Sequence, residues 1–186
     1  DLSLDEANRV LQEIAITNTD KTGYTFAGWL IDPNTSGADA TVSDTANESG
    51  EYTLTIPAGA YGDITVTAQF TANTYEVAFN GNGATSGEMA NQVFTYDTPQ
   101  ALNENAYSKT GYSFGGWATT ETGEATYADK QEVENLTTSG VYELFAVWTA
   151  NQYIVSFNSN GGSDCDDITV TYDSEYGELP IPTKDG

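Results

Sequence analysis

The fold is decided by a nine-residue stretch, Lys21-Thr22-Gly23-Tyr24-Thr25-Phe26-Ala27-Gly28-Trp29, which occurs twice in the chain. Its second copy is Lys109-Thr110-Gly111-Tyr112-Ser113-Phe114-Gly115-Gly116-Trp117, at a sequence offset of 88 (109 − 21). The two copies differ only by exchanges between small residues, Thr25 for Ser113 and Ala27 for Gly115. An internal repeat of this kind indicates a tandem array and has to be interpreted before any other pattern.

Further segments around this stretch repeat in the same order. The matching pairs are 70–73 with 148–151, 75–80 with 153–158, and 95–97 with 171–173. The first two pairs share a sequence offset of 78 (148 − 70), which we take as the length of one repeat unit. Because the offset between the two nine-residue stretches is larger by 10 (88 − 78), the first copy carries a net insertion, which we place at about 50–63.

Each copy is expected to fold into short strands. Tyr75, Val77 and Phe79 alternate with other residues, and residues 153–157 repeat this period of two, which is typical of a strand with one buried face. Asn-Gly pairs follow both segments and predict turns, because both turn residues tolerate positive φ. These pairs lie at residues 80–81, 82–83 and 160–161.

Two local features modify this strand pattern. Tyr24 and Phe26 share one face of their strand, but Trp29 has the opposite parity, so we predict a bulge or turn at Gly28 that returns Trp29 to the same core. Near the N-terminus, Ser3 to about Ile14 is predicted to form a short helix, with Ser3 as the N-cap and Glu6 completing a capping box.

The composition excludes several classes of function. The 186 residues carry 28 acidic and 5 basic side chains, a formal net charge of -23 at pH 7. Nucleic acids and anionic membranes attract Lys and Arg, and no apolar run approaches the roughly 18 residues of a membrane span, so we expect neither nucleic acid nor membrane insertion. The chain has no His, which excludes imidazole catalysis, and Cys165 has no second cysteine with which to form a disulfide. We expect no enzyme activity and no cofactor.

The order of these elements resembles the Listeria–Bacteroides repeat, also called the internalin B-repeat. The segments that carry the resemblance are 153–161, 170–172, 179–186, 111–117 and 144–148. The resemblance implies a bacterial cell-surface protein with tandem modules of a small, ubiquitin-like β-grasp fold. The first copy departs from the pattern, since Gln69-Phe70 stands where the family usually ends in Trp. With this resemblance, the fold class is expected to be mainly β (α+β): tandem small β-grasp-like modules with a short N-terminal helix.

The phase of the repeat leaves two divisions of the chain open. Counted from Lys21, residues 1–20 form an N-terminal helix or cap, 21–108 a first permuted unit and 109–186 a second. In the family's own frame, 74–151 is one complete repeat flanked by two half repeats. Half a unit leaves strand edges bare, so either each permuted unit closes on itself or the halves complete one another between molecules as an end-to-end or swapped oligomer.

Aromatic residues could in principle bind sugars, but we interpret most of them as the core of each repeat. Trp29, Trp117 and Trp148 stand at repeated positions, and large aromatics dominate core burial. The complete predicted repeat core is Tyr24, Phe26, Trp29, Phe79, Tyr112, Phe114, Trp117, Trp148 and Phe157. Tyrosines outside the repeated motif are better platform candidates, namely Tyr61, Tyr107 and Tyr127.

One loop has the residue types of a calcium site. Asp164, Asp166 and Asp167 lie in a turn rich in Asn and Ser, and carboxylate and carbonyl oxygens are the ligands that Ca²⁺ takes. The loop lacks the spacing of an EF-hand, so a solvated hairpin is the favoured interpretation and no metal site is expected. The acidic stretch 121–134 has the same standing.

These observations predict a non-catalytic, extracellular repeat region of a longer bacterial surface or secreted protein. Its expected role is that of a stalk, spacer or adhesion module, whose partners include the neighbouring repeats of the same chain. The alternative is direct binding of a host protein or glycan through exposed strand edges and Tyr patches.

Overall fold

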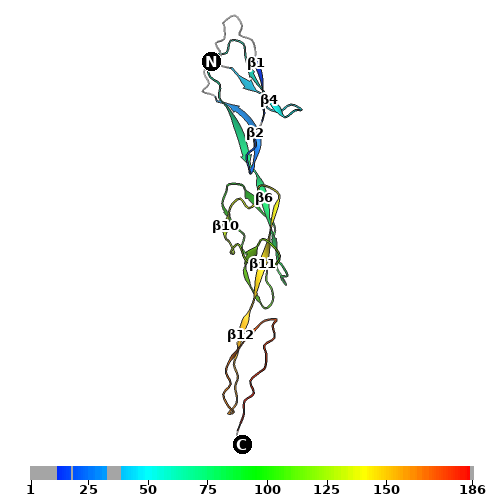
Figure 1. The fold of residues 1–186 in the computed structure, drawn as a ribbon, viewed down its shortest axis with the longest axis vertical. Coiled ribbons are helices and arrows are strands. Elements are labelled where there is room, and N and C mark those ends of the chain that lie inside the picture. The colour runs from blue at the N-terminus through cyan, green and yellow to red at the C-terminus, as the bar shows by residue number, and fades with distance from the viewer. Residues whose placement is uncertain (1–11, 18, 33–38, 185–186) are drawn as a thin grey trace. The chain divides into compact units, whose positions relative to one another are not determined.

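The computed structural model describes residues 12–17, 19–32 and 39–184. Every regular element in this part is a β-strand, so the mainly-β prediction is confirmed, and none of these residues forms a helix that could cross a membrane (Figure 1). The chain divides into two compact units. Unit 1 comprises Asp1–Tyr75, Thr95–Thr98 and Thr137–Gly140, and unit 2 comprises Glu76–Phe94, Pro99–Leu136 and Val141–Gly186.

Unit 1 contains a three-stranded sheet and a strand pair. The sheet has the order β1-β4-β3, and β2 pairs with β5 in antiparallel fashion. The strands are β1 (Gln12–Thr17), β2 (Tyr24–Ile31), β3 (Thr41–Val42), β4 (Glu51–Ile56) and β5 (Val66–Ala72). The Phe26 ring meets the rings of Tyr52 on β4 and Phe70 on β5 edge-on at 5.5 and 5.6 Å, so an aromatic cluster joins the sheet to the pair.

The helix predicted for Ser3 to Ile14 is wrong where the structure describes it. Residues 12–14 begin β1, in which Ile14 pairs with Leu54 of β4; residues 3–11 lie outside the described part of the chain. Ile14, Ile16 and Thr17 are β-branched, which disfavours helix and suits a pleated surface. Pairing with β4 therefore decides the conformation of residues 12–14, although the apolar residues of this segment are spaced as in a helix.

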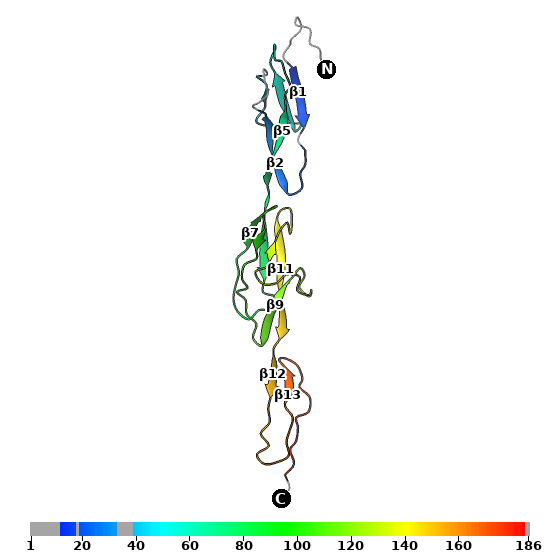
Figure 2. The ribbon, with the colours of Figure 1, turned by 90° about the vertical axis from the view of Figure 1, so that its left-hand side faces the viewer.

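In the family's own frame, we call residues 1–73, 74–151 and 152–186 the first, second and third copies of the repeat. A four-stranded sheet forms the centre of the second copy. Its order is β7-β6-β11-β9, with β6 parallel to β11 and β9 antiparallel to it; Figure 2 shows β9 and β11 side by side. The strands are β6 (Thr74–Asn80), β7 (Gln92–Thr95), β9 (Tyr112–Ala118) and β11 (Val141–Ala150). The short strands β8 (Gln100–Ala101) and β10 (Glu132–Val133) pair with each other. All these strands lie within residues 74–150.

The third copy contributes one strand pair, β12 (Gln152–Val155) with β13 (Ile168–Thr171), which is labelled by β12 in Figure 1. In the described residues, no strand ladder joins 12–72 to 74–108. The strand pairing thus follows the frame in which 74–151 is one repeat, while the folding unit itself stays a prediction.

The core of the second copy follows the predicted period of two. Along β6, Tyr75, Val77 and Phe79 are buried, and Leu144 and Ala146 of β11 lie beside them, so the alternation is confirmed. Trp117 of β9 is 0% exposed and packs against Phe79 and Phe114, with ring centroids 4.9 and 5.0 Å away. The indole Nε1 atoms of Trp29 and Trp117 are buried without a hydrogen-bond partner among the described residues, a cost in free energy that burial of the large indole rings has to offset.

Turns form at two of the three Asn-Gly pairs with the expected backbone. Asn82 and Asn160 both have φ 46°, and the glycine after each also has positive φ. The amide oxygen of Asn80 accepts a hydrogen bond from the Asn82 N–H at 2.9 Å, and Asn158 does the same for Asn160 at 3.0 Å. The connections from β6 to β7 and from β12 to β13 are longer than a two-residue hairpin.

The bulge predicted at Gly28 is confirmed and occurs in both copies. The register of β2 against β5 shifts between Phe26 and Gly28, and the register of β9 against β11 shifts opposite Gly116. Both Gly28 and Gly116 have φ 125°, a conformation that side chains disfavour. The shift brings Trp29 to 5.5 Å from the Phe26 ring, as the parity argument required.

Alanine substitutions at the two bulges test how closely each is packed. A Cβ at Gly116 would lie 2.7 Å from the Tyr127 carbonyl oxygen, whereas none of the described atoms lies within 4 Å of a Cβ at Gly28. Alanine at either position adopts the same strained φ of 125°, and at Gly116 its Cβ also collides with Tyr127. We therefore expect Gly28→Ala to cost about 1–2 kcal/mol of unfolding free energy and Gly116→Ala about 2–4 kcal/mol. Urea unfolding followed by Trp fluorescence measures both, and equal losses would contradict the packing argument.

Candidate functional site

The nine-residue stretch begins with the same tight turn in both copies. The N–H of Tyr24 donates to the Lys21 carbonyl oxygen at 3.0 Å, and Tyr112 donates to Lys109 at the same distance. The third residue of each turn, Gly23 or Gly111, has φ of 77° or 79°, as a type II turn requires. A turn with these features presents a bare glycine backbone at its tip.

In unit 1, this bare backbone receives a tyrosine from the next copy of the repeat. A Cβ on Gly23 would overlap the Tyr96 ring, so the ring lies directly against the turn. The Tyr24 and Tyr96 rings meet edge-on, with centroids 6.0 Å apart, and the Tyr24 hydroxyl donates to Asp97 Oδ2 at 2.7 Å. Asn73 connects the two sides: its N–H donates to the Gly23 carbonyl, and its own carbonyl accepts from the Tyr96 N–H, both at 2.9 Å.

In unit 2, the same arrangement recurs one copy later. Asn151 donates to the Gly111 carbonyl at 2.9 Å and accepts from the Tyr172 N–H at 2.8 Å. The Tyr112 and Tyr172 rings are 5.6 Å apart, and the Tyr112 hydroxyl donates to Asp173 Oδ2 at 3.3 Å. We call these sites junction 1 (Gly23, Tyr24, Asn73, Tyr96, Asp97) and junction 2 (Gly111, Tyr112, Asn151, Tyr172, Asp173).

Smaller contacts repeat as well. The hydroxyl of Thr25 donates to Asn73 Oδ1, and that of Ser113 donates to Asn151 Oδ1, both at 2.6 Å. Asp97 and Asp173 have φ of 57° and 58°, the left-handed conformation that Asp tolerates better than most residues. Thr25 and Ser113 differ by a methyl group, but both have the hydroxyl group that donates this hydrogen bond.

The charges at the junctions favour the neutral tyrosines. The hydrogen bond to Asp97 is the main cause that raises the pKa of Tyr24 above its usual value near 10, and burial adds to it. For Tyr112, burial is the main cause of the raised pKa, followed by the negative charge of Asp173. Lys21 and Lys109 place their ammonium groups 3.5 and 4.5 Å from the Tyr24 and Tyr112 ring centroids. Two of the chain's five basic residues thus stand over junction tyrosines.

The predicted repeat core is placed in two different environments. Phe79 and Trp117 are buried, while Tyr24, Phe26, Trp29, Tyr112, Phe114, Trp148 and Phe157 are half-buried. Trp148 is held in place by its Nε1, which donates to the Gly81 carbonyl at 2.9 Å. Sequence reasoning missed that Tyr24 and Tyr112 contact the next copy; the signal was the Tyr-Asp pair that repeats at 96–97 and 172–173.

Two of the three proposed platform tyrosines have structural contacts instead. The Tyr107 hydroxyl donates to the Phe79 carbonyl at 2.7 Å, and its ring lies 6.4 Å from that of Trp117. Tyr127 is half-buried and forms a β-bridge with the buried Trp117. Tyr61 is exposed, with 67% of its surface accessible, and therefore stays a candidate for a sugar-binding platform.

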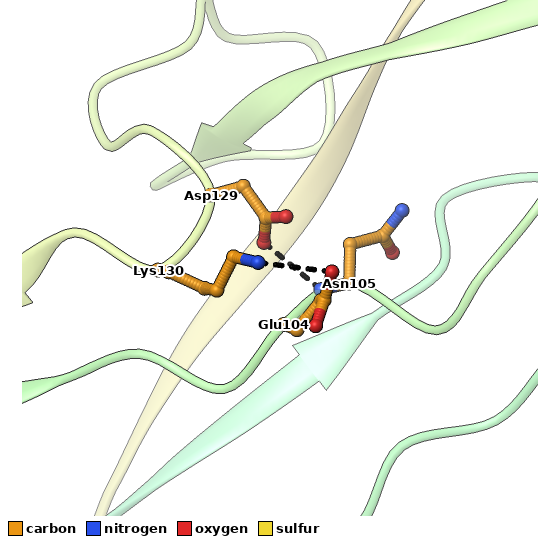
Figure 3. A network of polar contacts seen from close by, with 4 residues as sticks. All are labelled: Glu104, Asn105, Asp129 and Lys130. Atoms are coloured by element: carbon orange, nitrogen blue, oxygen red, sulfur yellow. Dashed lines mark hydrogen bonds and ion pairs between the residues drawn. The ribbon is translucent and has the colours of Figure 1, made fainter.

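The acidic candidates do not converge in the structure. Among the described residues, no three His, Cys, Asp or Glu side chains gather as a metal site would need, and Asp164, Asp166 and Asp167 are exposed. In the stretch 121–134, Lys130 forms an ion pair with Glu104 at 2.9 Å, and the Asn105 N–H donates to Asp129 Oδ1 at 2.9 Å (Figure 3). The Glu104 contact raises the pKa of Lys130. These contacts fix two neighbouring loops to each other.

Comparison with known proteins agrees with this repeated geometry. The Listeria-Bacteroides repeat domain matches residues 75–147 and 153–186, and the divergent InlB B-repeat domain matches residues 11–74. The chain belongs to the Listeria-Bacteroides repeat family. The resemblance inferred from the sequence is therefore confirmed, and the first copy is the divergent one.

Relatives of this repeat region are much longer proteins. The chain is 31% identical over 171 residues to a protein named as a Gly-rich membrane protein of Evansella cellulosilytica, covering 91% of the chain and 19% of the relative. It is 35% identical over 150 residues to internalin H of Listeria monocytogenes, covering 78% of the chain and 22% of the relative. The chain thus spans about a fifth of the length of these relatives. No solved structure matches it.

The hydroxyl contacts of the junctions can be tested with single-atom changes. We expect Tyr24→Phe to lower the melting temperature of the chain more than Tyr112→Phe, because the Tyr24 bond to aspartate is 2.7 Å and the Tyr112 bond is 3.3 Å. Since both pKa values are raised, this stabilisation is present below pH 10 and is lost as the pH rises through the folded-state pKa values. Tyrosinate absorbance and melting curves between about pH 8 and 12 measure both effects; equal pH dependence in wild type and Tyr24→Phe would contradict them.

The calcium alternative has a direct test. Because Asp164, Asp166 and Asp167 are exposed and do not converge, we expect the melting temperature in millimolar Ca²⁺ to equal that in EDTA. A ligand that binds only the folded chain would raise the melting temperature in proportion to its saturation. A rise of several degrees that disappears in Asp166→Asn would establish a calcium site in this loop.

Proposed function

We propose that this chain is a non-catalytic, extracellular stalk or spacer region of a bacterial cell-surface protein. The observation that carries the proposal is the junction itself. The same five positions contact one another at both transitions between successive copies, with matching hydrogen bonds at 2.8–2.9 Å. Repeat proteins whose units contact only their neighbours use such interfaces to extend an array without long-range contacts.

The chemistry of the surface supports a structural role. The chain has no His, and most aspartates and glutamates outside the junctions have no acidic counterpart at the repeat offset of 78. What repeats is the core, the bulge glycine and the junction. Selection on the copies therefore acts on folding and joining, which is what a spacer needs.

The β-grasp form of each module is part of the same proposal. Parallel pairing of the first and last strands of the second copy, β6 and β11, supports it. In the described part of this copy, the connection between them contains β7 to β10 and no helix. The module is in this respect an all-strand variant of the grasp arrangement that the family resemblance implied.

Direct binding of a host protein or glycan is the second candidate. It is favoured by exposed aromatic and apolar side chains, including Tyr61 at 67% and Tyr176 at 62% exposure. Tyr176 also borders an apolar hollow of about 260 Å³ in unit 2, lined by Val155, Ile168, Val170 and Leu179. The residues that line this hollow would be buried if two chains formed an end-to-end or swapped oligomer.

The stalk role is tested by inserting the chain between a wall anchor and a reporter domain on a bacterial surface. The control is a Gly/Ser linker of equal length, which behaves as a coil with a root-mean-square extension of about 75 Å. We expect the folded chain to make the reporter more accessible to a bulky antibody than the linker does, because each folded module keeps its own dimensions whereas a coil collapses and fluctuates. Equal accessibility would contradict the spacer role. Binding of the purified chain to a glycan array or to host-cell proteins, lost in Tyr61→Ala or Tyr176→Ala, would favour the second candidate.

A further inference from the structure

We propose that the Gly-Tyr turn of one repeat and the Tyr-Asp turn of the next form a matched interaction surface that couples the folding of adjacent repeats. The partner of each surface is the neighbouring repeat of this family. Coupling is a property beyond the spacer role, since modules that fold independently would also separate two ends.

The composition of unit 1 is the first argument. This compact unit contains two segments of the second copy, Thr95–Thr98 and Thr137–Gly140, although the residues that flank both segments belong to unit 2. The first segment carries Tyr96 and Asp97, which contact Tyr24. The second is held by the Asn73 side chain, whose Nδ2 donates to the Thr138 carbonyl at 3.2 Å. Two separate loops of one copy are therefore part of the other copy's compact unit.

Both loops are attached directly to the central sheet of the second copy. Thr95 is the last residue of β7, and Gly140 immediately precedes β11. These two strands flank β6 in the sheet order, and their buried side chains, Phe94 and Leu144, are 1% and 0% exposed. A change in the packing of this sheet therefore alters the positions of the loops that contact the first copy.

The complementarity of the two turns is the second argument. Gly23 and Gly111 have no side chain where Tyr96 and Tyr172 lie, and positive φ makes a side chain there doubly unfavourable. Each hydroxyl of the first turn then meets an aspartate of the second turn that has left-handed backbone geometry. The match requires glycine on one repeat and Tyr-Asp on the next, and both junctions of the chain have it.

The two junctions differ in a way that predicts unequal coupling. Junction 1 has the shorter Tyr–Asp hydrogen bond, 2.7 Å against 3.3 Å. We therefore expect the stronger coupling at junction 1.

Segment-resolved hydrogen exchange of the full chain tests the proposal. Leu144→Ala opens a cavity in the core of the second copy, and Leu144 is not itself a junction residue. We expect it to accelerate exchange in β9 and β11 and also, by about tenfold, in β2 and β5 of the first copy. In a chain that also carries Tyr96→Ala, the effect of Leu144→Ala on β2 and β5 should disappear.

Matched variants separate coupling from simple loss of stability. Gly23→Ala disrupts junction 1 from the side of the first copy and should also abolish the effect of Leu144→Ala on β2 and β5, measured against Gly23→Ala alone. Tyr172→Ala, the same substitution at junction 2, should leave that effect intact. Unchanged exchange in β2 and β5 when Leu144→Ala is introduced with junction 1 intact would overturn the proposal, as would an effect that persists in Tyr96→Ala. Neither result would bear on the spacer role, which the reporter experiment measures separately.

Discussion

Bare glycine backbone at two places in one nine-residue stretch is the constraint on which the rest of the structure depends. Gly28 and Gly116, at φ 125°, allow the strand to skip a residue and bring the following Trp onto the core face. Gly23 and Gly111, earlier in the same stretch, leave room for a tyrosine ring from the next repeat. Core and junction are therefore specified within a single turn and strand, which explains why this stretch is the most similar part of the copies.

The contacts between neighbouring copies have an energetic reason. A module as short as one repeat unit buries a smaller share of its surface than a large domain, so its core is thin. In the second copy, the largest fully buried side chain is Trp117, whose indole N–H is unpaired among the described residues. Contacts with a neighbour add to what such a core can supply, and the edge-on Tyr pairs and charge-assisted hydrogen bonds at the junctions are contacts of this kind.

Much of the strand content could be predicted from the sequence because it depends on local periodicity. The alternation of Tyr75, Val77 and Phe79 and the parity of Trp29 are properties of adjacent residues, and both predictions were correct. The helix at Ser3 to Ile14 was wrong over residues 12–14 because pairing with β4, a strand much later in the sequence, decides their conformation. The junctions were missed for the same reason: Tyr24 has the pattern of a core residue, and only the fold shows that Asp97 is within reach of its hydroxyl.

The placement of the junction halves has a consequence for how such genes change over time. Each copy begins with the half that supplies a Tyr-Asp turn to the preceding copy and ends with the half that receives one from the next, so duplication or deletion of a whole copy leaves every remaining junction complete. Recombination between copies can then alter the number of modules without a compensating substitution anywhere else. A divergent first copy that retains Gly23, Tyr24 and Asn73 fits this form of inheritance, in which the ends of a module are held constant while its interior accumulates insertions.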